Sequence, residues 1–336
     1  MEKKTVLVTG ATGFVGSHIL EALLDIDGIR LIAACRDPSR LIAGYEGEVR
    51  QGDLRSPSYL QEVFRDVDVV CNAAAWTSVW NHEKASRELF LQPSLRMIDA
   101  ARAAGVRRFI QTSSTSVAAP ENSGDPMSHG IRRGIWPHLD NVIAIEDYLR
   151  EMASEQFGVI NLRLGLFAGA RYGLGLVPML LPRLRTHLVP WVRGGQTSMP
   201  IIDGRDVGHA FACAVRSDGL EPYASFNIVG PSVPTVRQVI EYIHETWGYP
   251  RPHFSVPFFI AYPFARMMEL LDPLVPWEPL VTRSIVHLLE EVGADNLRAT
   301  QQLGYDPKHD WRMALQRQVL EMEQRQGPAM KMARPV

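Results

Sequence analysis

Short apolar runs alternate with amphipathic stretches through the first half of the chain, and each run has the length of a buried strand. The runs predict strands over residues 6–8, 31–35, 49–51, 67–71, 109–112 and 159–164. The amphipathic stretches predict helices after Gly13 and over residues 59–64, 85–104 and 139–156. Strands that alternate with helices pair in parallel through right-handed crossovers. The pattern therefore predicts an α/β protein with a doubly wound parallel sheet.

After Leu166 the pattern changes. Residues 169–175 are rich in glycine, and residues 177–184 are apolar with two prolines. Further on, a turn opens a helix near residue 204, a strand is expected over 226–230, and helices are expected over 235–247, 257–271 and 311–325. This half lacks the regular alternation of the first.

The first strand leads into a turn that contains Gly10, Gly13 and Gly16 and then into the first helix. Gly10 permits a tight turn, Gly13 allows backbone to approach a phosphate, and Gly16 lets the helix lie close to the strand. Free N–H groups and the helix dipole favour anions at that helix N-terminus. The stretch therefore predicts binding of a dinucleotide.

Composition and charge exclude several classes of protein. The net charge of −2 over 336 residues gives no electrostatic footprint for nucleic acid. The cysteines Cys35, Cys71 and Cys213 lie far apart in apolar runs, which indicates core thiols in a reducing compartment and no metal site. No run is long enough to span a membrane, and the charged residues 2–4 lead directly into the first strand. We therefore expect a cytoplasmic protein.

Several segments resemble the extended short-chain dehydrogenase/reductases, in the branch of the dihydroflavonol reductases and 3β-hydroxysteroid dehydrogenases. These segments are Thr9-Gly-x-x-Gly-x-x-Gly16, Gly52-Asp53, Asn72-Ala-Ala74, Phe109 to Val117, Leu162-Arg-Leu-Gly165, Ile202 to Val207 and Leu303-Gly-Tyr-Asp-Pro307. The resemblance implies a Rossmann domain over residues 1–166 and about 200–230. It also implies a smaller substrate domain over about 167–199 and 231–322, a flexible tail over 323–336, and a homodimer through the helices at 85–104 and 139–156.

The resemblance also implies which residues bind the cofactor. They are Thr9, Gly10, Thr12, Gly13, Phe14, Val15, Gly16, Arg36, Asp53, Leu54, Asn72, Ala73 and Ala74. The second strand ends in Arg36-Asp37, at the position that meets the adenosine ribose. An acidic residue there favours NAD, whereas an arginine accommodates the 2′-phosphate of NADP. We favour NADP(H), because Arg36 directly follows the strand and its planar guanidinium can bind a phosphate.

The catalytic tyrosine–lysine pair of the family is absent. Ser114 stands at the family's serine position, with Ser113, Thr115 and Ser116 as neighbours one or two residues away. Registering Glu146 on the family's glutamate-containing helix places His138 at the tyrosine and Val142 at the lysine. No other register supplies the pair, because the chain has no lysine between residues 85 and 307. Phe90 or a neighbour likewise replaces an asparagine of the family.

Three interpretations remain open at this stage. The first is a reductase in which His138, or His129, Arg132 or Arg133 of the adjoining loop, supplies the proton. The second is hydride transfer to a carbon–carbon double bond or an iminium, or a redox-neutral epimerase, dehydratase or isomerase. The third is an NADP(H)-binding sensor or accessory protein.

The residues expected around the pocket indicate a bulky apolar small-molecule substrate. They are Trp76, Trp80, Phe167, Tyr172, Met179, Leu180, Trp191, Phe258 and Phe259. The apolar helix over 258–271 could contact a membrane surface or an acyl chain, but we expect it to serve domain packing.

Overall fold

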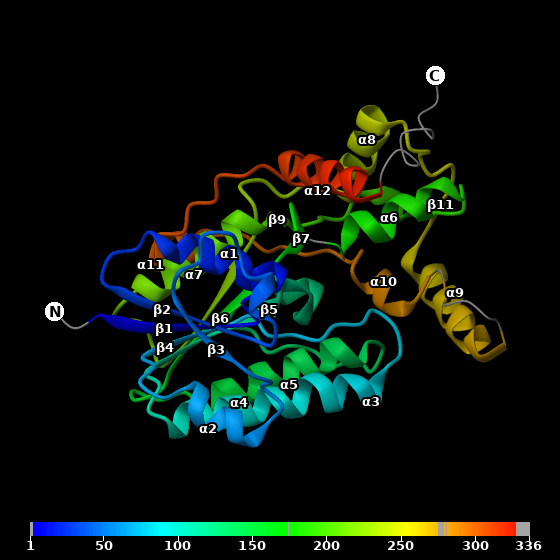
Figure 1. Ribbon diagram of the computed structural model, residues 1–336. Coiled ribbons are helices and arrows are strands. Elements are labelled where there is room, and N and C mark those ends of the chain that lie inside the picture. The colour runs from blue at the N-terminus through cyan, green and yellow to red at the C-terminus, as the bar shows by residue number, and fades with distance from the viewer. Residues whose placement is uncertain (1–2, 172, 174, 275–278, 280, 327–336) are drawn as a thin grey trace.

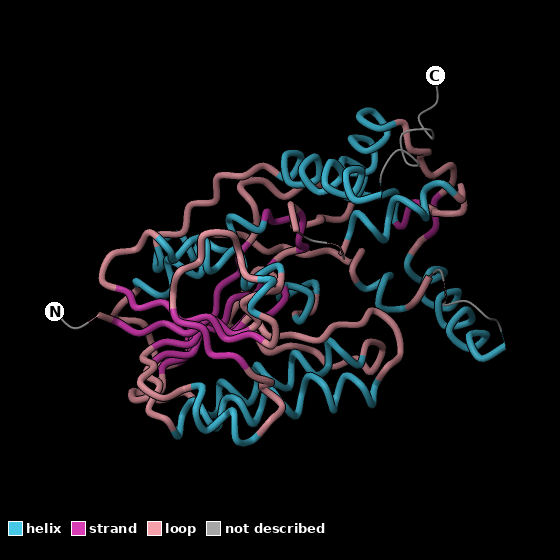
Figure 2. The backbone as a smooth tube through the Cα atoms, viewed as in Figure 1, coloured by secondary structure: helices cyan, strands magenta, loops and turns pink. Residues whose placement is uncertain are grey.

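The computed structural model describes residues 3–171, 173, 175–274, 279 and 281–326. Its centre is a seven-stranded sheet in the order β10-β6-β5-β4-β1-β2-β3, and every neighbouring pair is parallel. Figure 2 shows these strands as one layer between helices. The prediction of a doubly wound α/β sheet is confirmed.

β1 and β4 are neighbours in the middle of the sheet, and the strands that follow each of them in the chain lie on opposite sides of this pair. At such a switch point the loops at the carboxyl ends of the strands diverge and leave a crevice for a ligand. The strands of the sheet are β1 (Lys4–Thr9), β2 (Ile29–Cys35), β3 (Glu48–Gln51), β4 (Val69–Asn72), β5 (Arg108–Ser114), β6 (Gly158–Leu164) and β10 (Tyr223–Ile228).

Helices cover both faces of the sheet (Figure 1). One face packs on α1 (Phe14–Leu24), α7 (Gly204–Arg216) and α11 (Leu297–Leu303). The other packs on α2 (Pro57–Val63), α4 (Gln92–Ala103) and α5 (Pro137–Met152). The cysteines Cys35, Cys71 and Cys213 are buried free thiols, as predicted.

Two of the long helices differ from their predicted form. The segment expected as one helix over 85–104 consists of α3 (Glu83–Ser86), a π-helical turn over Arg87–Leu91, and α4. A π turn inserts an extra residue and rotates the side chains that follow it. The other helix, α5, ends at Met152 and not near residue 156, because Ser154 and Phe157 exchange backbone hydrogen bonds in a tight turn.

The second half of the chain forms smaller units beside the carboxyl edge of the sheet (Figure 1). Two short pairs, β7 (Leu166–Ala168) with β9 (Ile201–Asp203) and β8 (Trp191–Val192) with β11 (Ser255–Val256), are additional to the predicted strands. The remaining helices are α6 (Leu176–Arg185), α8 (Val236–Trp247), α9 (Phe258–Leu271), α10 (Arg283–His287) and α12 (Trp311–Gln326). Since α12 continues to Gln326, residues 323–326 of the expected tail are helical, and residues 327–336 lie outside the described part.

The expectation that residues 258–271 serve domain packing is only half met. Ala261 and Ala265 are buried against Val192 and Val286, so one side of α9 does pack inward. The opposite side of α9 is exposed, and the Phe259 side chain on it keeps 77% of its surface accessible. No helix in the described part of the chain combines the length and apolar character that a membrane crossing requires.

Candidate functional site

The glycine turn lies at the switch point and has the geometry that its spacing predicts. Gly10 has φ +62°, and a Cβ added there would lie 2.6 Å from the carbonyl oxygen of Ala73. A Cβ on Gly16 would collide with the Gly10 carbonyl, whereas Gly13 is exposed and faces open space apart from that same carbonyl. The first N–H groups of α1 have no partner four residues back and are available to an anion.

Asn72 ties together the ends of three strands. Thr9 donates from Oγ1 to Asn72 Oδ1 at 2.6 Å, and Asn72 Nδ2 donates to Gln111 Oε1 at 2.8 Å. The same Oδ1 accepts from the backbone N–H of Ala74 at 3.2 Å. Asn72 is only 1% exposed, and these bonds hold the loop after β4 in place.

Arg36 and Asp37 at the end of β2 are both exposed, but their surroundings differ. Asp37 caps the following turn, since its Oδ1 accepts from the backbone N–H and the hydroxyl of Ser39 at 3.1 and 2.7 Å. These bonds lower the pKa of Asp37. Across the strand ends, Asp53 is bound by Arg55, whose hydrogen bonds lower the pKa of that carboxyl to about 2. The carboxylates of Asp37 and Asp53 are therefore already hydrogen-bonded to neighbouring residues.

Ser113 and Ser114 diverge at the end of β5. Ser113 donates to Glu146 Oε1 at 2.5 Å and is buried. Ser114 is half-buried, and its Oγ accepts from the backbone N–H of Ser116 at 3.2 Å. The Ser114 hydroxyl hydrogen has no acceptor among the described residues, so Ser114 can donate to a ligand.

Glu146 anchors α5 to the sheet through a buried ion pair. Its carboxylate accepts from Arg163 at 2.7 and 3.0 Å and from Asn161 at 2.8 Å. Glu146 and Arg163 are 3% and 1% exposed. Arg163 also donates to the backbone carbonyl of Ser128 at 2.6 Å, which fixes the loop before α5. The network sets the position of His138 at the start of that helix.

His138 lies among aromatic rings contributed by three segments. The ring centroids of Phe90, Trp136 and Trp76 lie 4.9, 6.3 and 6.4 Å from that of the imidazole. Burial lowers the pKa of His138 to about 4. Its Nδ1 is buried and has no hydrogen-bond partner among the described residues. The imidazole is therefore neutral at neutral pH. Its pKa is lower than the ordinary value near 6.5 that was assumed from the sequence.

The position expected for the family's lysine is apolar, and a tyrosine further along the same helix points elsewhere. Val142 is 9% exposed and belongs to the hydrophobic core beneath α5. Tyr148 donates to Asp99 Oδ1 at 2.5 Å on the outer surface between α4 and α5, and this bond raises its pKa to about 12. Of the loop cations, Arg132 and His129 face Asp147 at 2.5 and 3.5 Å. Arg133 binds Glu290 at 2.9 Å.

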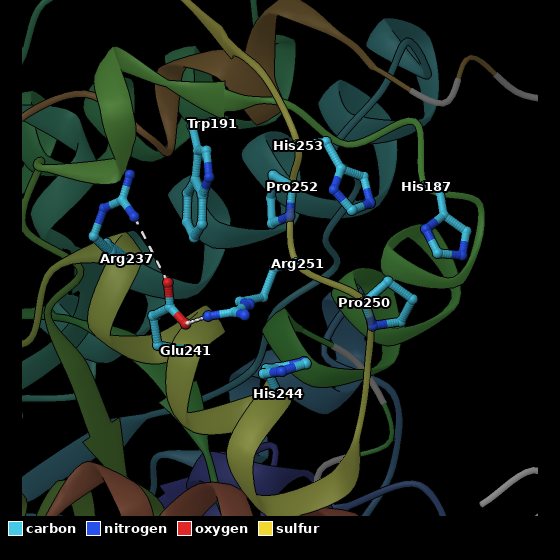
Figure 3. A pocket seen from close by; sticks show the side chains of 9 residues that line it. All are labelled: His187, Trp191, Arg237, Glu241, His244, Pro250, Arg251, Pro252 and His253. Atoms are coloured by element: carbon cyan, nitrogen blue, oxygen red, sulfur yellow. Dashed lines mark hydrogen bonds and ion pairs between the residues drawn. The ribbon is translucent and has the colours of Figure 1, made fainter. Parts of the chain in front are cut away.

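The aromatic residues expected around one pocket are dispersed. Phe167 contacts Phe14 with centroids 5.6 Å apart, and Trp80 donates to Asp272 at 3.2 Å. Trp191 lines a polar hollow of about 570 Å³ in the second half of the chain, where Arg237 stacks 4.3 Å above its ring (Figure 3). Met179, Leu180 and Phe258 are half-buried, Phe259 is exposed, and Tyr172 lies outside the described residues.

Comparison with known proteins assigns the chain to a family. The family model described as the NAD-dependent epimerase/dehydratase family matches residues 6–229. The chain belongs to this family. A 3β-hydroxysteroid dehydrogenase/decarboxylase isoform 2 of Arabidopsis thaliana is 27% identical over 90% of this chain, which spans 59% of that relative. Sterol demethylase protein B of Methylococcus capsulatus is 26% identical over 80% of this chain and 82% of its own length.

Solved structures share the fold. MoeE5, crystallised with UDP-glucuronic acid and NAD, superposes with a TM-score of 0.68 at 22% identity and covers 96% of this chain and 100% of its own. The resemblance to the extended short-chain dehydrogenase/reductases is therefore confirmed. The described residues contain no group of three or more His, Cys, Asp or Glu that could hold a metal ion.

In this member of the NAD-dependent epimerase/dehydratase family, sequence reasoning missed a polar cluster beside the serine segment. His287 bonds the backbone carbonyl of Ser116 at 2.9 Å and Glu290 at 3.1 Å. Tyr262 donates to Glu290 at 2.6 Å. Burial opposes ionisation of Glu290, but hydrogen bonds from His287, Tyr262 and Arg133 prevail and lower its pKa to about 2. Arg133 and Glu290 of this polar cluster are 157 residues apart along the chain, and no local sequence motif predicts the cluster.

Proposed function

We propose that the chain is an NADP(H)-dependent oxidoreductase that transfers hydride to a bulky apolar carbonyl, enone or imine without the standard tyrosine–lysine relay. The observation that carries the proposal is the glycine turn at the β1/β4 switch point together with the free hydroxyl of Ser114 at the end of β5. The family assignment supports a nicotinamide cofactor.

The residues at the switch point fit a dinucleotide. The open space at Gly13 and the uncapped N–H groups of α1 suit a pyrophosphate, with Thr9, Thr12, Phe14 and Val15 forming the turn around it. Leu54 follows β3, and Ala73 and Ala74 follow β4, so all three lie in loops at the carboxyl edge of the sheet, where they would line the cofactor site. Bound there, the reduced cofactor supplies hydride to an electrophilic carbon. Arg36 supports NADP(H), because Asp37 is committed to capping its own turn.

Ser114 and His138 orient the substrate oxygen. The Ser114 hydroxyl donates one hydrogen bond, and the neutral imidazole of His138 donates another from its single N–H. A neutral imidazole can polarise a carbonyl in this manner. As charge develops on the oxygen, both bonds strengthen, and the proton that completes the product comes from water along them.

An apolar substrate is supported by the surroundings of His138. Trp76, Phe90 and Trp136 present apolar surface there, and Val142 stands where the family has a lysine. The curated relatives named above act on hydroxysteroids and sterols according to their names, which accords with a large apolar substrate class.

The test is consumption of NADPH with a panel of bulky ketones, enones and imines, followed by nicotinamide absorbance. Ser114→Ala and His138→Ala should each lower kcat by about tenfold or more, since a positioned donor typically contributes about 10²–10⁴ in rate. NADPH affinity should stay intact. Ser232→Ala and His253→Ala, at exposed positions, are the matched controls.

Two alternatives give different outcomes. A redox-neutral epimerase, dehydratase or isomerase would convert substrate with no net change in NADPH, and the family name supports that reading. A sensor would bind NADPH tightly and consume no member of the panel. If His138→Tyr with Val142→Lys creates ketone reduction that the wild type lacks, carbonyl chemistry is not the native reaction.

A further inference from the structure

The exposed side of α9 is an unbroken apolar face. Seven side chains between residues 259 and 274 keep 41–79% of their surface exposed. They are Phe259, Ile260, Phe264, Met267, Leu270, Leu271 and Leu274. Their spacing of three and four residues places them along one side of the helix. We call these seven residues the α9 face. Soluble proteins leave single large apolar residues exposed, but rarely a contiguous row of them.

The exposed charge on α9 itself is basic, since Arg266 is exposed on the helix. Arg251, in the segment that leads into it, is also exposed and pairs with Glu241 at 3.1 Å. The acidic residues of the helix and of the turn after it, one buried and one half-buried, are bound by other side chains. Glu269 is 7% exposed and paired with Arg283 at 2.6 Å, and Asp272 accepts from Trp80. An apolar face with a basic border complements a surface that is apolar inside and anionic outside.

The shape of the α9 face favours a flat partner over a second copy of the chain. The helix has 14 residues and stands at the margin of the molecule, at the right in Figure 1. A contact with a second copy through this element would rest on one helix of 14 residues, whereas a stable interface involves about 20–30 residues on each side. A lipid surface covers the whole protruding face at once.

We propose that α9 docks the protein on an anionic phospholipid bilayer, with the α9 face in the acyl–headgroup boundary and Arg266 at the lipid phosphates. The helix is too short to cross a bilayer, which takes about 20 residues, and it lies in the plane of the surface. The protein is thereby held at the bilayer, where large apolar molecules concentrate. This inference is independent of the chemistry of Ser114.

The experiment is co-sedimentation of the full-length protein with vesicles of phosphatidylcholine alone or mixed with phosphatidylserine. The wild type should bind the mixed vesicles. Phe259→Asp with Leu270→Asp should weaken binding at least tenfold, roughly the effect of losing one buried apolar side chain. Arg266→Glu should weaken binding to the mixed vesicles by about fivefold or more and leave binding to phosphatidylcholine unchanged.

Matched controls lie on other helices. Leu297→Asp with Leu320→Asp removes exposed leucines from α11 and α12, and Arg317→Glu reverses an exposed charge on α12. Both control proteins should bind as the wild type does. A second readout does not depend on a loss of vesicle binding. An environment-sensitive dye on Phe259→Cys should shift to the blue when mixed vesicles are added, and the same dye on Leu297→Cys should not.

Three results would overturn the proposal. The first is an absence of vesicle binding by the wild type. The second is equal loss of binding in the α9 variants and the controls. The third is light scattering that shows a lipid-free dimer converted to a monomer by Phe259→Asp with Leu270→Asp, because a second copy would then be the occupant of the α9 face.

Discussion

His138 illustrates how one residue depends on its surroundings. Its pKa is about 4 in the folded protein and near 6.5 in the unfolded chain, so between these values the unfolded chain binds the extra proton. The free energy of unfolding should therefore be level above about pH 6.5 and fall as the pH drops towards 4. The buried His18, whose pKa is also lowered to about 4, contributes in the same direction.

Replacing His138 by phenylalanine should remove its share of this slope, which is at most about 1.4 kcal/mol per pH unit. Urea unfolding at pH 7 and pH 5 measures the slope while avoiding the titration of most carboxylates. His253→Phe, at an exposed position, should keep the wild-type slope. An unchanged slope in His138→Phe would mean that the imidazole is not protected from protonation.

Arg36 decides between the two nicotinamide cofactors if the proposal is right. Losing a charge-assisted hydrogen bond to phosphate costs about 1.5–3 kcal/mol, which is about tenfold or more in affinity. Arg36→Asp should weaken NADPH binding by that factor and leave NADH nearly unchanged. Arg65→Asp makes the same charge change at an exposed position before β4 and is the control. Calorimetry in which the wild type prefers NADH would refute the assignment.

At the scale of elements, α5 depends on the ion pair between Glu146 and Arg163. Glu146→Ala leaves a buried guanidinium without its partner and should cost about 3–5 kcal/mol in unfolding free energy. Glu146→Leu with Arg163→Met removes both charges and should recover much of that loss. Denaturant melts of the wild type, Glu146→Leu, Arg163→Met and the double variant measure the coupling. Additive losses would show that the two charges act independently.

The elements also differ in how far sequence predicts them. Gly105 has φ +82° and follows α4, so a single glycine signals the end of the helix. The π turn over Arg87–Leu91 was not predicted, although Pro93 just after it has no N–H to donate to the carbonyl four residues back. The short pair β8–β11 joins residues 64 apart in the chain and has too few residues to show a strand pattern.

For the whole molecule, the homodimer through the helices at 85–104 and 139–156 stays a prediction. Leu89 is the exposed large apolar residue of those two segments, at 38% exposure. Size-exclusion with light scattering at micromolar concentration should give the mass of a dimer, and Leu89→Arg should shift it towards the monomer. Leu320→Arg, on α12, is the matched control and should leave the mass unchanged. A monomeric wild type would remove the prediction.

The sequence by itself determined the parallel sheet, the glycine turn and the absence of any lysine between residues 85 and 307. The first two depend on neighbouring residues or on their spacing. Gly10 and Gly16 are required by contacts within the turn and with the loop after β4. Strands that alternate with helices pair in parallel because each helix carries the chain back over the sheet.

Only the tertiary structure decided what the polar side chains do. Ser113 and Ser114 are equivalent in sequence, but the strand turns the first towards Glu146 and leaves the second free to donate. The neutral state of His138 comes from burial among rings, two of which, Trp76 and Phe90, are distant in sequence. The exposure of α9 depends on which of its sides meets the β8–β11 pair. Desolvation and hydrogen bonding act between residues that the fold brings together, so local pattern does not contain them.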